Sequence, residues 1–186
     1  CIARRIGKGE YGNVYKAVET SIMIAMIFGV VLMFIGVIFS GTFLKMMGSP
    51  DDVISLSTLY LRVYFLGMPA TMVYNFAGAI LRARGDTRRP LIALSIAGIL
   101  NALMNLLFVR VFHMDVAGVG LASALSSYVS GLITVRTLIK DESYIHLEIK
   151  KLFIDKQALL EIMKVGIPAG LQSTVFAISN VAIQSS

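Results

Sequence analysis

The stretch TSIMIAMIFGVVLMFIGVIFSGTFL, residues 20–44, has 25 residues and contains no Asp, Glu, Lys or Arg. A helix needs about 20 residues, at about 1.5 Å of rise each, to cross the roughly 30 Å hydrocarbon layer of a bilayer. This stretch therefore predicts a transmembrane helix. Four further windows lack charged side chains over a similar length, and each predicts another span: 63–81, 90–109, 116–135 and 165–186.

The overall composition agrees with a membrane protein. Of the 186 residues, 56% are apolar and only 15% are charged, whereas soluble domains have about 25% charged residues. A folded chain of this size exposes a large surface, which in water has to be mostly polar. Disorder, a disulfide scaffold and a soluble enzyme domain are therefore excluded. We expect an all-α, polytopic membrane protein that is not an enzyme.

The residues that usually bind metals or nucleic acids are not grouped. Cys1 is the single cysteine, and the two histidines, His113 and His146, lie far apart. This spacing offers no metal-ligand cluster, so we expect no cofactor. The net charge of +6 does not come from a basic face interleaved with aromatic residues, so we expect no nucleic-acid partner.

Lysine and arginine are unevenly distributed among the segments between the windows. Segments 1–19, 82–89 and 136–164 carry four, four and six of the 17 basic residues, whereas 45–62 and 110–115 carry two and one. Basic residues collect in the cytoplasmic connections of membrane proteins. The alternation predicts a multi-pass protein of the plasma (inner) membrane whose N-terminal segment is cytoplasmic.

Residues 139–164 separate the fourth window from the fifth. Within them, the apolar positions of 144–164 recur in a helical rhythm between charged residues, which is typical of an amphipathic helix at a membrane surface. We expect a cytoplasmic linker containing such a helix and leading into the fifth span. The chain begins with Cys1 and stops inside an apolar window, so we also expect an internal fragment of a longer protein.

One motif points to a different function. From Gly7 to Val14 the sequence GKGEYGNV matches the glycine-rich loop of protein kinases, G-x-G-x-x-G-x-V. A kinase needs a strand–turn–strand at this loop and a lysine-bearing strand soon after it, but here 25 uncharged residues begin at Thr20. We interpret the motif as a flexible cytoplasmic loop that binds no nucleotide; a membrane-tethered kinase is the alternative.

Polar residues inside the predicted spans are candidates for a transport path. Asn101 and Asn105 are four residues apart, so they lie on one face of a helix. Polar groups at membrane depth mark either helix–helix contacts or a solvated cavity, and for these asparagines the two interpretations carry equal weight. The full set of candidate transport-path residues is Asn101, Asn105, Tyr74, Asn75, Gln172 and Asn180.

Several segments in series resemble one family, the multidrug and toxic compound extrusion (MATE) transporters. They are YLRVYFLGMP at 60–69, ILRARGDTRRP at 80–90, VAGVGLA at 116–122 and GIPAGLQ at 166–172. The resemblance runs from about residue 4 to the end of the chain. Its most specific part is the loop that contains Arg82, Gly85, Asp86 and Pro90.

The 82–90 loop also has a physical interpretation. It must reverse the chain between two helices within nine residues, so we expect Gly85 to adopt a backbone conformation that is costly for a side chain. Asp86 is placed to accept hydrogen bonds at the start of the next helix.

The resemblance implies a two-lobe transporter of twelve helices. Its members export organic cations and other toxic compounds in exchange for Na⁺ or H⁺ by alternating access. The five spans resemble helices three to seven: residues 1–138 would belong to the first lobe, 139–164 to the inter-lobe linker, and 165–186 to the first helix of the second lobe. Asn105 matches a position that is an aspartate of the ion site in part of the family, which leaves the coupling ion undetermined.

Two alternatives to a drug exporter remain. A lipid or lipid-linked-sugar flippase shares the two-lobe architecture, but its cavity would need Lys and Arg, and none of the five windows contains either. The other alternative is that the truncated chain is inactive. An exporter would take a small organic molecule as substrate and the lipid bilayer as its surroundings.

Overall fold

The computed structural model describes residues 2–48, 50–148 and 152–184. All regular structure in these residues is helical, which confirms the predicted all-α fold. The elements in chain order are α1 (Ile2–Gly7), α2 (Tyr11–Met46), α3 (Asp51–Phe65), α4 (Met68–Ala83), α5 (Arg88–Leu106), the π-helical turn η1 (Leu107–Val111), α6 (Asp115–Ile139) and α7 (Lys156–Gln184).

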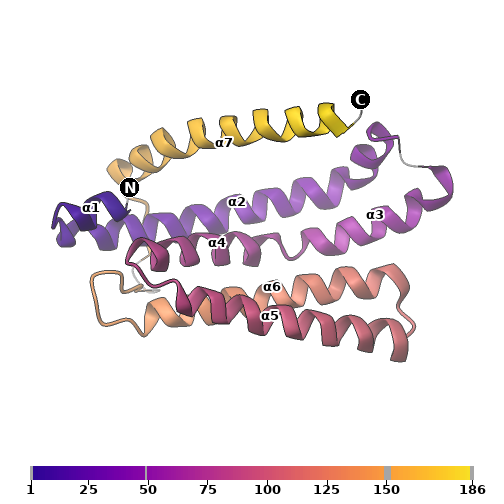
Figure 1. Ribbon diagram of the computed structural model, residues 1–186, viewed down its shortest axis with the longest axis horizontal. Coiled ribbons are helices and arrows are strands. Elements are labelled where there is room, and N and C mark those ends of the chain that lie inside the picture. Colours follow the sequence, from indigo (N-terminus) through magenta and orange to yellow (C-terminus); the bar gives the residue numbers. More distant parts are fainter. Residues whose placement is uncertain (1, 49, 149–151, 185–186) are drawn as a thin grey trace.

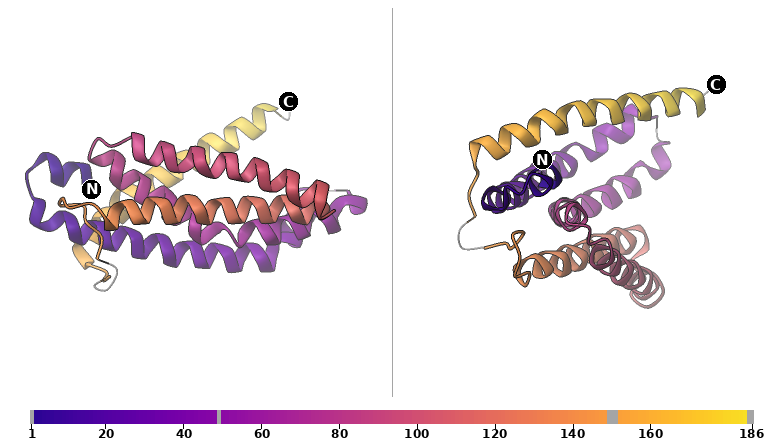
Figure 2. Two further views of the ribbon diagram at one scale, coloured as in Figure 1. Left: turned by 90° about the horizontal axis from the view of Figure 1, so that it is seen from below. Right: turned by 60° about the vertical axis from the view of Figure 1, so that its left-hand side comes forward.

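The helices form an elongated bundle in which α4 is central. It contacts α2 on one side and α6 on the other, and α5 packs on α6 (Figure 1). α3 precedes α4, lies toward the opposite end of the bundle and also contacts both α2 and α6 (Figure 1). α7 runs beside α2 on the outer side of the bundle, away from α5 and α6 (Figure 2).

The connections between helices collect at the two ends of the bundle. α1, the α4–α5 turn and the segment that follows α6 lie at one end, which we call the α1 end (Figure 1). The α2–α3 and α5–α6 connections lie at the opposite end, the far end. The three segments that are rich in lysine and arginine therefore meet at the α1 end.

Several helices are suited to a bilayer. Among the described residues, α2, α5 continued by η1, and α6 are long and apolar enough to cross a membrane, and α3 with α4 passes as one span bent by 47°. These helices contain the first four predicted spans. The fifth predicted span, 165–186, lies in α7, which is not among them; residues 185 and 186 are outside the described residues.

The second span is longer than its charge-free window. The window starts after Arg62, but α3 begins at Asp51 and runs through Arg62 to Phe65. Arg62 is exposed on α3, so its charge does not enter the helix packing and does not end the helix. Arg62, which the charge-free windows assign to the segment between two spans, therefore lies within a helix.

The bend between α3 and α4 falls at Leu66 and Gly67. Pro69 stands in the first turn of α4, where its missing amide costs no helical hydrogen bond. A Cβ atom on Gly67 would lie 2.8 Å from Cα of Ala124, so glycine is needed for α6 to pass this closely. The chain therefore bends at a point where α6 packs closely against it.

The segment after α6 differs from its prediction. Residues 144–148 and 152–155 are not helical, and α7 begins only at Lys156; the remaining linker residues, 149–151, lie outside the described residues. The side chains of Ile145 and Leu147 are buried, and Leu147 N–H donates to the Leu138 carbonyl at 3.2 Å. The amphipathic helix predicted over 144–164 is thus wrong for this part, because alternate residues pack back onto the end of α6.

The glycine-rich motif also differs from its prediction as a flexible loop. α1 ends at Gly7, Gly9 has a φ of +73°, and α2 begins at Tyr11, so the motif forms a helix–turn–helix. The kinase loop would require a strand–turn–strand, and no described residue in this segment is in a strand.

Buried apolar side chains concentrate at the α1 end. α2, α4, α6 and the segment after α6 all contribute to one core, which consists of Ile2, Val14, Ala17, Val18, Ile22, Ala77, Ile80, Leu81, Leu138, Ile145, Leu147 and Ala158. Outward-facing positions along the helices are apolar as well; Ile38 and Leu132, for example, are 63% and 69% exposed. Such surfaces are unfavourable in water and suit a lipid environment.

Candidate functional site

The α4–α5 turn is a glycine-terminated helix end. Gly85 N–H donates to the Arg82 carbonyl at 2.9 Å, and Asp86 N–H donates to the Leu81 carbonyl at 3.0 Å. This is the Schellman arrangement, which requires a left-handed residue just after the helix. Gly85 provides it with a φ of +96°, as expected from the sequence.

The same turn also organises the start of α5. Asp86 Oδ1 accepts a hydrogen bond from Arg89 N–H at 3.1 Å, and Asp86 Oδ2 lies 3.2 Å from Arg89 Nε. Pro90 is buried, and its carbonyl accepts a hydrogen bond from the Tyr74 hydroxyl at 3.3 Å. The Arg82 side chain is exposed. The turn is thereby fixed both to α5 and to α4.

Asp141, just beyond α6, joins this turn to a third helix. Its side chain is only 4% exposed and pairs with Arg84 and with Arg89, whose Nη1 lies 3.1 Å from Oδ2. The hydroxyl of Ser143 and its backbone N–H, at 3.0 Å, both donate to Oδ1. We call Arg84, Asp86, Arg89, Asp141 and Ser143 the turn junction.

The turn junction keeps Asp141 ionised. Burial alone would raise the pKa of this carboxyl group. The hydrogen bonds from Ser143, together with the charge and hydrogen bond of Arg84, outweigh burial and lower the pKa below its ordinary value. Asp141 therefore carries a negative charge between two arginines throughout the neutral pH range.

A second polar cluster lies between α5 and α6. Asn105 Nδ2 donates to Asn101 Oδ1 at 3.1 Å, and Asn101 Nδ2 lies 3.3 Å from the hydroxyl oxygens of both Ser123 and Ser126. We call these four residues the amide network. Within the described residues, Asn105 Oδ1 is buried and has no hydrogen-bond partner. This oxygen can accept one more donor or a cation.

The two asparagines therefore differ in what they do. Asn101 uses both polar atoms of its side chain in contacts, including the contact to α6. That agrees with the interpretation of these residues as a helix–helix contact. Asn105 retains an unused oxygen, which agrees with the interpretation as a polar cavity.

The other four candidate residues lie elsewhere. Tyr74 contacts Pro90 at the α1 end, Asn75 is exposed on α4, and Gln172 and Asn180 are exposed on α7. No recorded hydrogen bond between described residues joins any of them to the amide network. Among the described residues, Asn101 and Asn105 are the two candidates that share a hydrogen bond.

Six residues of these clusters are not among the candidates named from the sequence: Arg84, Arg89, Ser123, Ser126, Asp141 and Ser143. The window 116–135 contains several serines, and nothing in the sequence distinguishes Ser126 from the others. Asp141 directly follows α6, and nothing in the pattern pairs it with an arginine 57 positions earlier. In the described part of the chain, no group of three or more His, Cys, Asp or Glu residues could hold a metal ion.

A family model described as MatE matches residues 1–107 of this chain. This is more than half of its 186 residues.

Curated relatives match over almost the whole chain. The probable multidrug resistance protein YpnP of Bacillus subtilis is 32% identical over 179 residues, which cover 96% of this chain and 38% of YpnP. The multidrug export protein MepA of Staphylococcus aureus is 24% identical over 182 residues, covering 98% of this chain and 40% of MepA. The chain thus spans about two fifths of the length of these relatives.

Solved structures have the same helix arrangement. A crystal structure of MATE in the bent conformation superposes with a TM-score of 0.90 at 25% identity, covering 97% of this chain and 40% of that one. The outward-facing conformation of a multidrug resistance MATE family transporter of the MOP superfamily gives a TM-score of 0.86 at 25% identity, with the same coverage. The fold of the described residues is therefore that of a multi-pass membrane transporter.

Proposed function

Because this chain belongs to the MatE family, we propose that it forms the central part of a secondary active exporter of drugs and other organic, often cationic, compounds. Transport would be driven by Na⁺ or H⁺ moving in the opposite direction, with alternating access between two lobes. The multidrug names of the relatives support this function. In this proposal residues 1–138 belong to the first lobe, 139–164 are the inter-lobe linker, and 165–186 begin the second lobe.

The observation that carries the proposal is the amide network. Asn105 Oδ1 is a buried acceptor that has no hydrogen-bond partner among the described residues, in a helix otherwise rich in Leu, Ile and Ala. An amide oxygen can coordinate Na⁺ or accept a hydrogen bond from a substrate, but it cannot carry a proton. We infer that Asn105 lines the transport path and that Asn101 holds it in place.

The experiment is transport of ethidium in proteoliposomes that contain the complete exporter. Either a Na⁺ gradient or a pH gradient is imposed, and the wild type is compared with Asn105→Leu and with Asn105→Asp. We expect Asn105→Leu to reduce transport at least fivefold. Asn105→Asp should retain transport and add a pH dependence, because the carboxyl group can titrate.

A matched control separates this effect from a general loss of polarity. Thr137→Val removes a hydroxyl that only bonds back to its own helix, at Ile133 O, and it should leave transport unchanged. Normal transport by Asn105→Leu would contradict a role in the path. Absence of ethidium transport by the wild type under both gradients would contradict the exporter itself.

We also propose that the α1 end faces the cytoplasm and that the chain lies in the plasma (inner) membrane. Support comes from the basic residues that gather at this end. Cysteines at the exposed positions Thr87 and Glu142 should react with an impermeant maleimide only in inverted vesicles, and one at Met47 only in intact cells. Ser49 lies outside the described residues. Labelling of Thr87→Cys in intact cells would contradict a cytoplasmic α1 end.

A lipid or lipid-linked-sugar flippase is not favoured, since the relatives are named for multidrug resistance and export. Arg62, although outside the charge-free windows, is helical and lies on α3, which together with α4 is long and apolar enough for one bent span. An inactive chain is tested by the ethidium assay on the 186 residues alone, which lack the other helices of the proposed exporter.

A further inference from the structure

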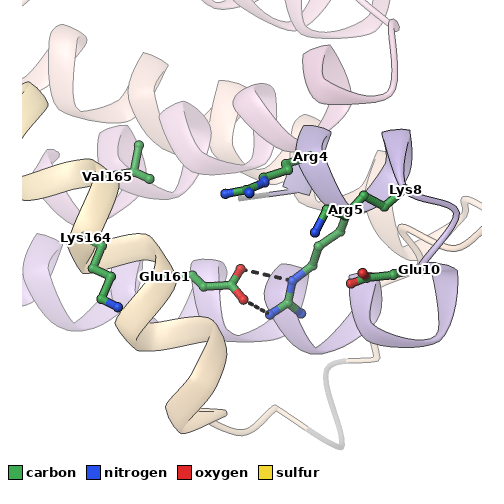
Figure 3. A pocket seen from close by; sticks show the side chains of 7 residues that line it. All are labelled: Arg4, Arg5, Lys8, Glu10, Glu161, Lys164 and Val165. Atoms are coloured by element: carbon green, nitrogen blue, oxygen red, sulfur yellow. Dashed lines mark hydrogen bonds and ion pairs between the residues drawn. The ribbon is translucent and has the colours of Figure 1, made fainter.

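An ion pair connects the first and last helices of the chain at the α1 end. Arg5 Nε and Nη2 donate to the two carboxylate oxygens of Glu161 on α7 at 3.2 and 3.0 Å (Figure 3). Arg5 Nη1 donates to the Asn13 carbonyl at 2.7 Å. Because the Arg5 side chain is 9% exposed and all three of these nitrogens are engaged, Arg5 holds α1 against α7 and is not available to another ligand.

The same ion pair forms the wall of a pocket of about 340 Å³ between α1 and α7. Four basic and two acidic side chains line it, with one apolar residue: Arg4, Arg5, Lys8, Lys164, Glu10, Glu161 and Val165 (Figure 3). Arg5 and Glu161 neutralise each other. The pocket is left with three cations against Glu10, an excess of two positive charges.

The three remaining cations line the pocket with exposed side chains, and the charge of Arg4 also acts on Glu161. Arg4, Lys8 and Lys164 are exposed, and no salt bridge between described residues engages any of them. Arg4 lies on α1, Lys8 in the turn that follows it and Lys164 on α7, and the Arg5–Glu161 pair holds these elements together. Separate surface charges are thereby gathered around one hollow.

The pocket also lies at a defined depth. Lys164 is the last charged residue before the uncharged stretch 165–186, and Val165 beside it is 61% exposed. The pocket therefore adjoins both a basic surface and the uncharged stretch of α7. On the topology proposed above, this is the level of the phospholipid headgroups.

We propose that this pocket binds the phosphate of an anionic phospholipid headgroup, with Arg4, Lys8 and Lys164 as its ligands. Basic pockets between helices on the cytoplasmic side of a membrane have the right charge for such headgroups. Charge-assisted hydrogen bonds from Arg and Lys to phosphate oxygens supply the attraction. The exposed Val165 favours a lipid over a free phosphate, because acyl chains would cover it.

The experiment measures lipid binding to the complete protein by native mass spectrometry, after delipidation and titration with phosphatidylglycerol or phosphatidylcholine. We expect the wild type to bind phosphatidylglycerol at least tenfold more tightly than phosphatidylcholine. The triple variant Arg4→Gln, Lys8→Gln, Lys164→Gln should lose most of this preference, because each basic residue near a membrane surface contributes about a fivefold attraction to anionic lipid.

A charge-matched variant serves as the control. Arg88→Gln, Arg136→Gln, Lys156→Gln removes three exposed basic residues near the same end of the molecule, and none of them lines the pocket. It should keep the preference within about twofold. An equal loss in both triple variants would attribute the binding to diffuse surface charge and overturn the proposal.

Two further measurements test the charge of the pocket and the kind of phosphate that it binds. Glu10→Gln removes the one unpaired acid of the pocket and should tighten phosphatidylglycerol binding about two- to fivefold; unchanged binding overturns the proposal even if the triple variant does not fold. Inorganic phosphate at about 10-fold excess over the lipid should not displace phosphatidylglycerol. Complete displacement would identify a soluble phosphate site instead. Because binding is measured without transport, its failure leaves the exporter proposal untouched.

Discussion

The turn junction and the amide network both join helices through polar side chains, but they differ in completeness. In the turn junction, an almost fully buried carboxylate is surrounded by two arginines and a serine, and both of its oxygens have partners. In the amide network the contacts are between neutral groups, two of them are 3.3 Å long, and one buried oxygen has no partner. A satisfied cluster of this kind stabilises a structure, whereas an unsatisfied one retains the capacity to bind.

The largest effect is expected at Asp141. Asp141→Ala leaves Arg84 and Arg89 without their shared partner, so it should lower the free energy of unfolding in detergent micelles by about 2–4 kcal/mol. Glu142→Ala removes the neighbouring acid, which is exposed, and should change stability by no more than about 0.5 kcal/mol. A smaller loss for Asp141→Ala than for Glu142→Ala would show that the turn junction does not stabilise the fold.

The stabilising effect of Asp141 should also depend on pH. Since the pKa of Asp141 is lowered in the folded chain, its contribution is complete above the ordinary pKa of an aspartate, about 3.9, and is lost as the pH falls through the lower folded value. The stability difference between wild type and Asp141→Ala should therefore be constant from about pH 5 to 8 and shrink below about pH 4. A difference that grows as the medium is acidified would contradict the paired carboxylate.

An intermediate effect is expected at the glycine of the turn. Gly85→Ala places a side chain at a φ of +96° and should cost about 1–2 kcal/mol, and Gly85→Val should cost more. Asp86→Ala should cost about 1 kcal/mol, since it removes the acceptor at the start of α5. We expect these variants to impair folding or gating more than substrate affinity, which efflux assays at several substrate concentrations would measure.

Gly98 provides the control for Gly85. It lies inside α5, and a Cβ atom there would meet no atom within 4 Å, so Gly98→Ala should be neutral or slightly stabilising. An equal free energy of unfolding for Gly85→Ala and Gly98→Ala would show that the left-handed conformation of Gly85 imposes no cost on a side chain.

The smallest effect on stability is expected in the amide network. Hydrogen bonds between membrane helices contribute about 0.6 kcal/mol on average and rarely more than about 1.7. Asn101→Leu should therefore cost about 1 kcal/mol, and Asn105→Leu, which also removes an unpaired oxygen, should cost less. Both should nevertheless impair efflux. A stability loss large enough to account for the lost efflux would assign the pair to packing alone.

The parts of the fold that depend on local sequence could be predicted. Charge-free windows located α2, α5 and α6, because a long uncharged stretch has few alternatives to a membrane helix. The left-handed Gly85 and the helix-start role of Asp86 also followed from their positions between two helices. The charge-free window does not predict where α3 begins, because Arg62 lies within this helix and an exposed arginine does not interrupt a helix.

The parts that depend on distant contacts could not be predicted. Ile145 and Leu147 pack against the end of α6, a tertiary contact that overrides the helical rhythm of their segment. The partners of Asp141 and of Arg5 are 57 and 156 positions away in the chain. Sequence spacing alone does not identify such pairs.

The length of α2 has a mechanical consequence. Its 36 residues make a rod of about 54 Å, and most of its buried side chains lie in the half nearest the α1 end. The other half packs on α3, so a tilt of α2 about the α1 end would carry α3 with it, and each degree of tilt would shift the far tip by about 1 Å. Adjustments among the side chains at the α1 end, each smaller than one bond length, would therefore be amplified into displacements of several ångströms at the far end.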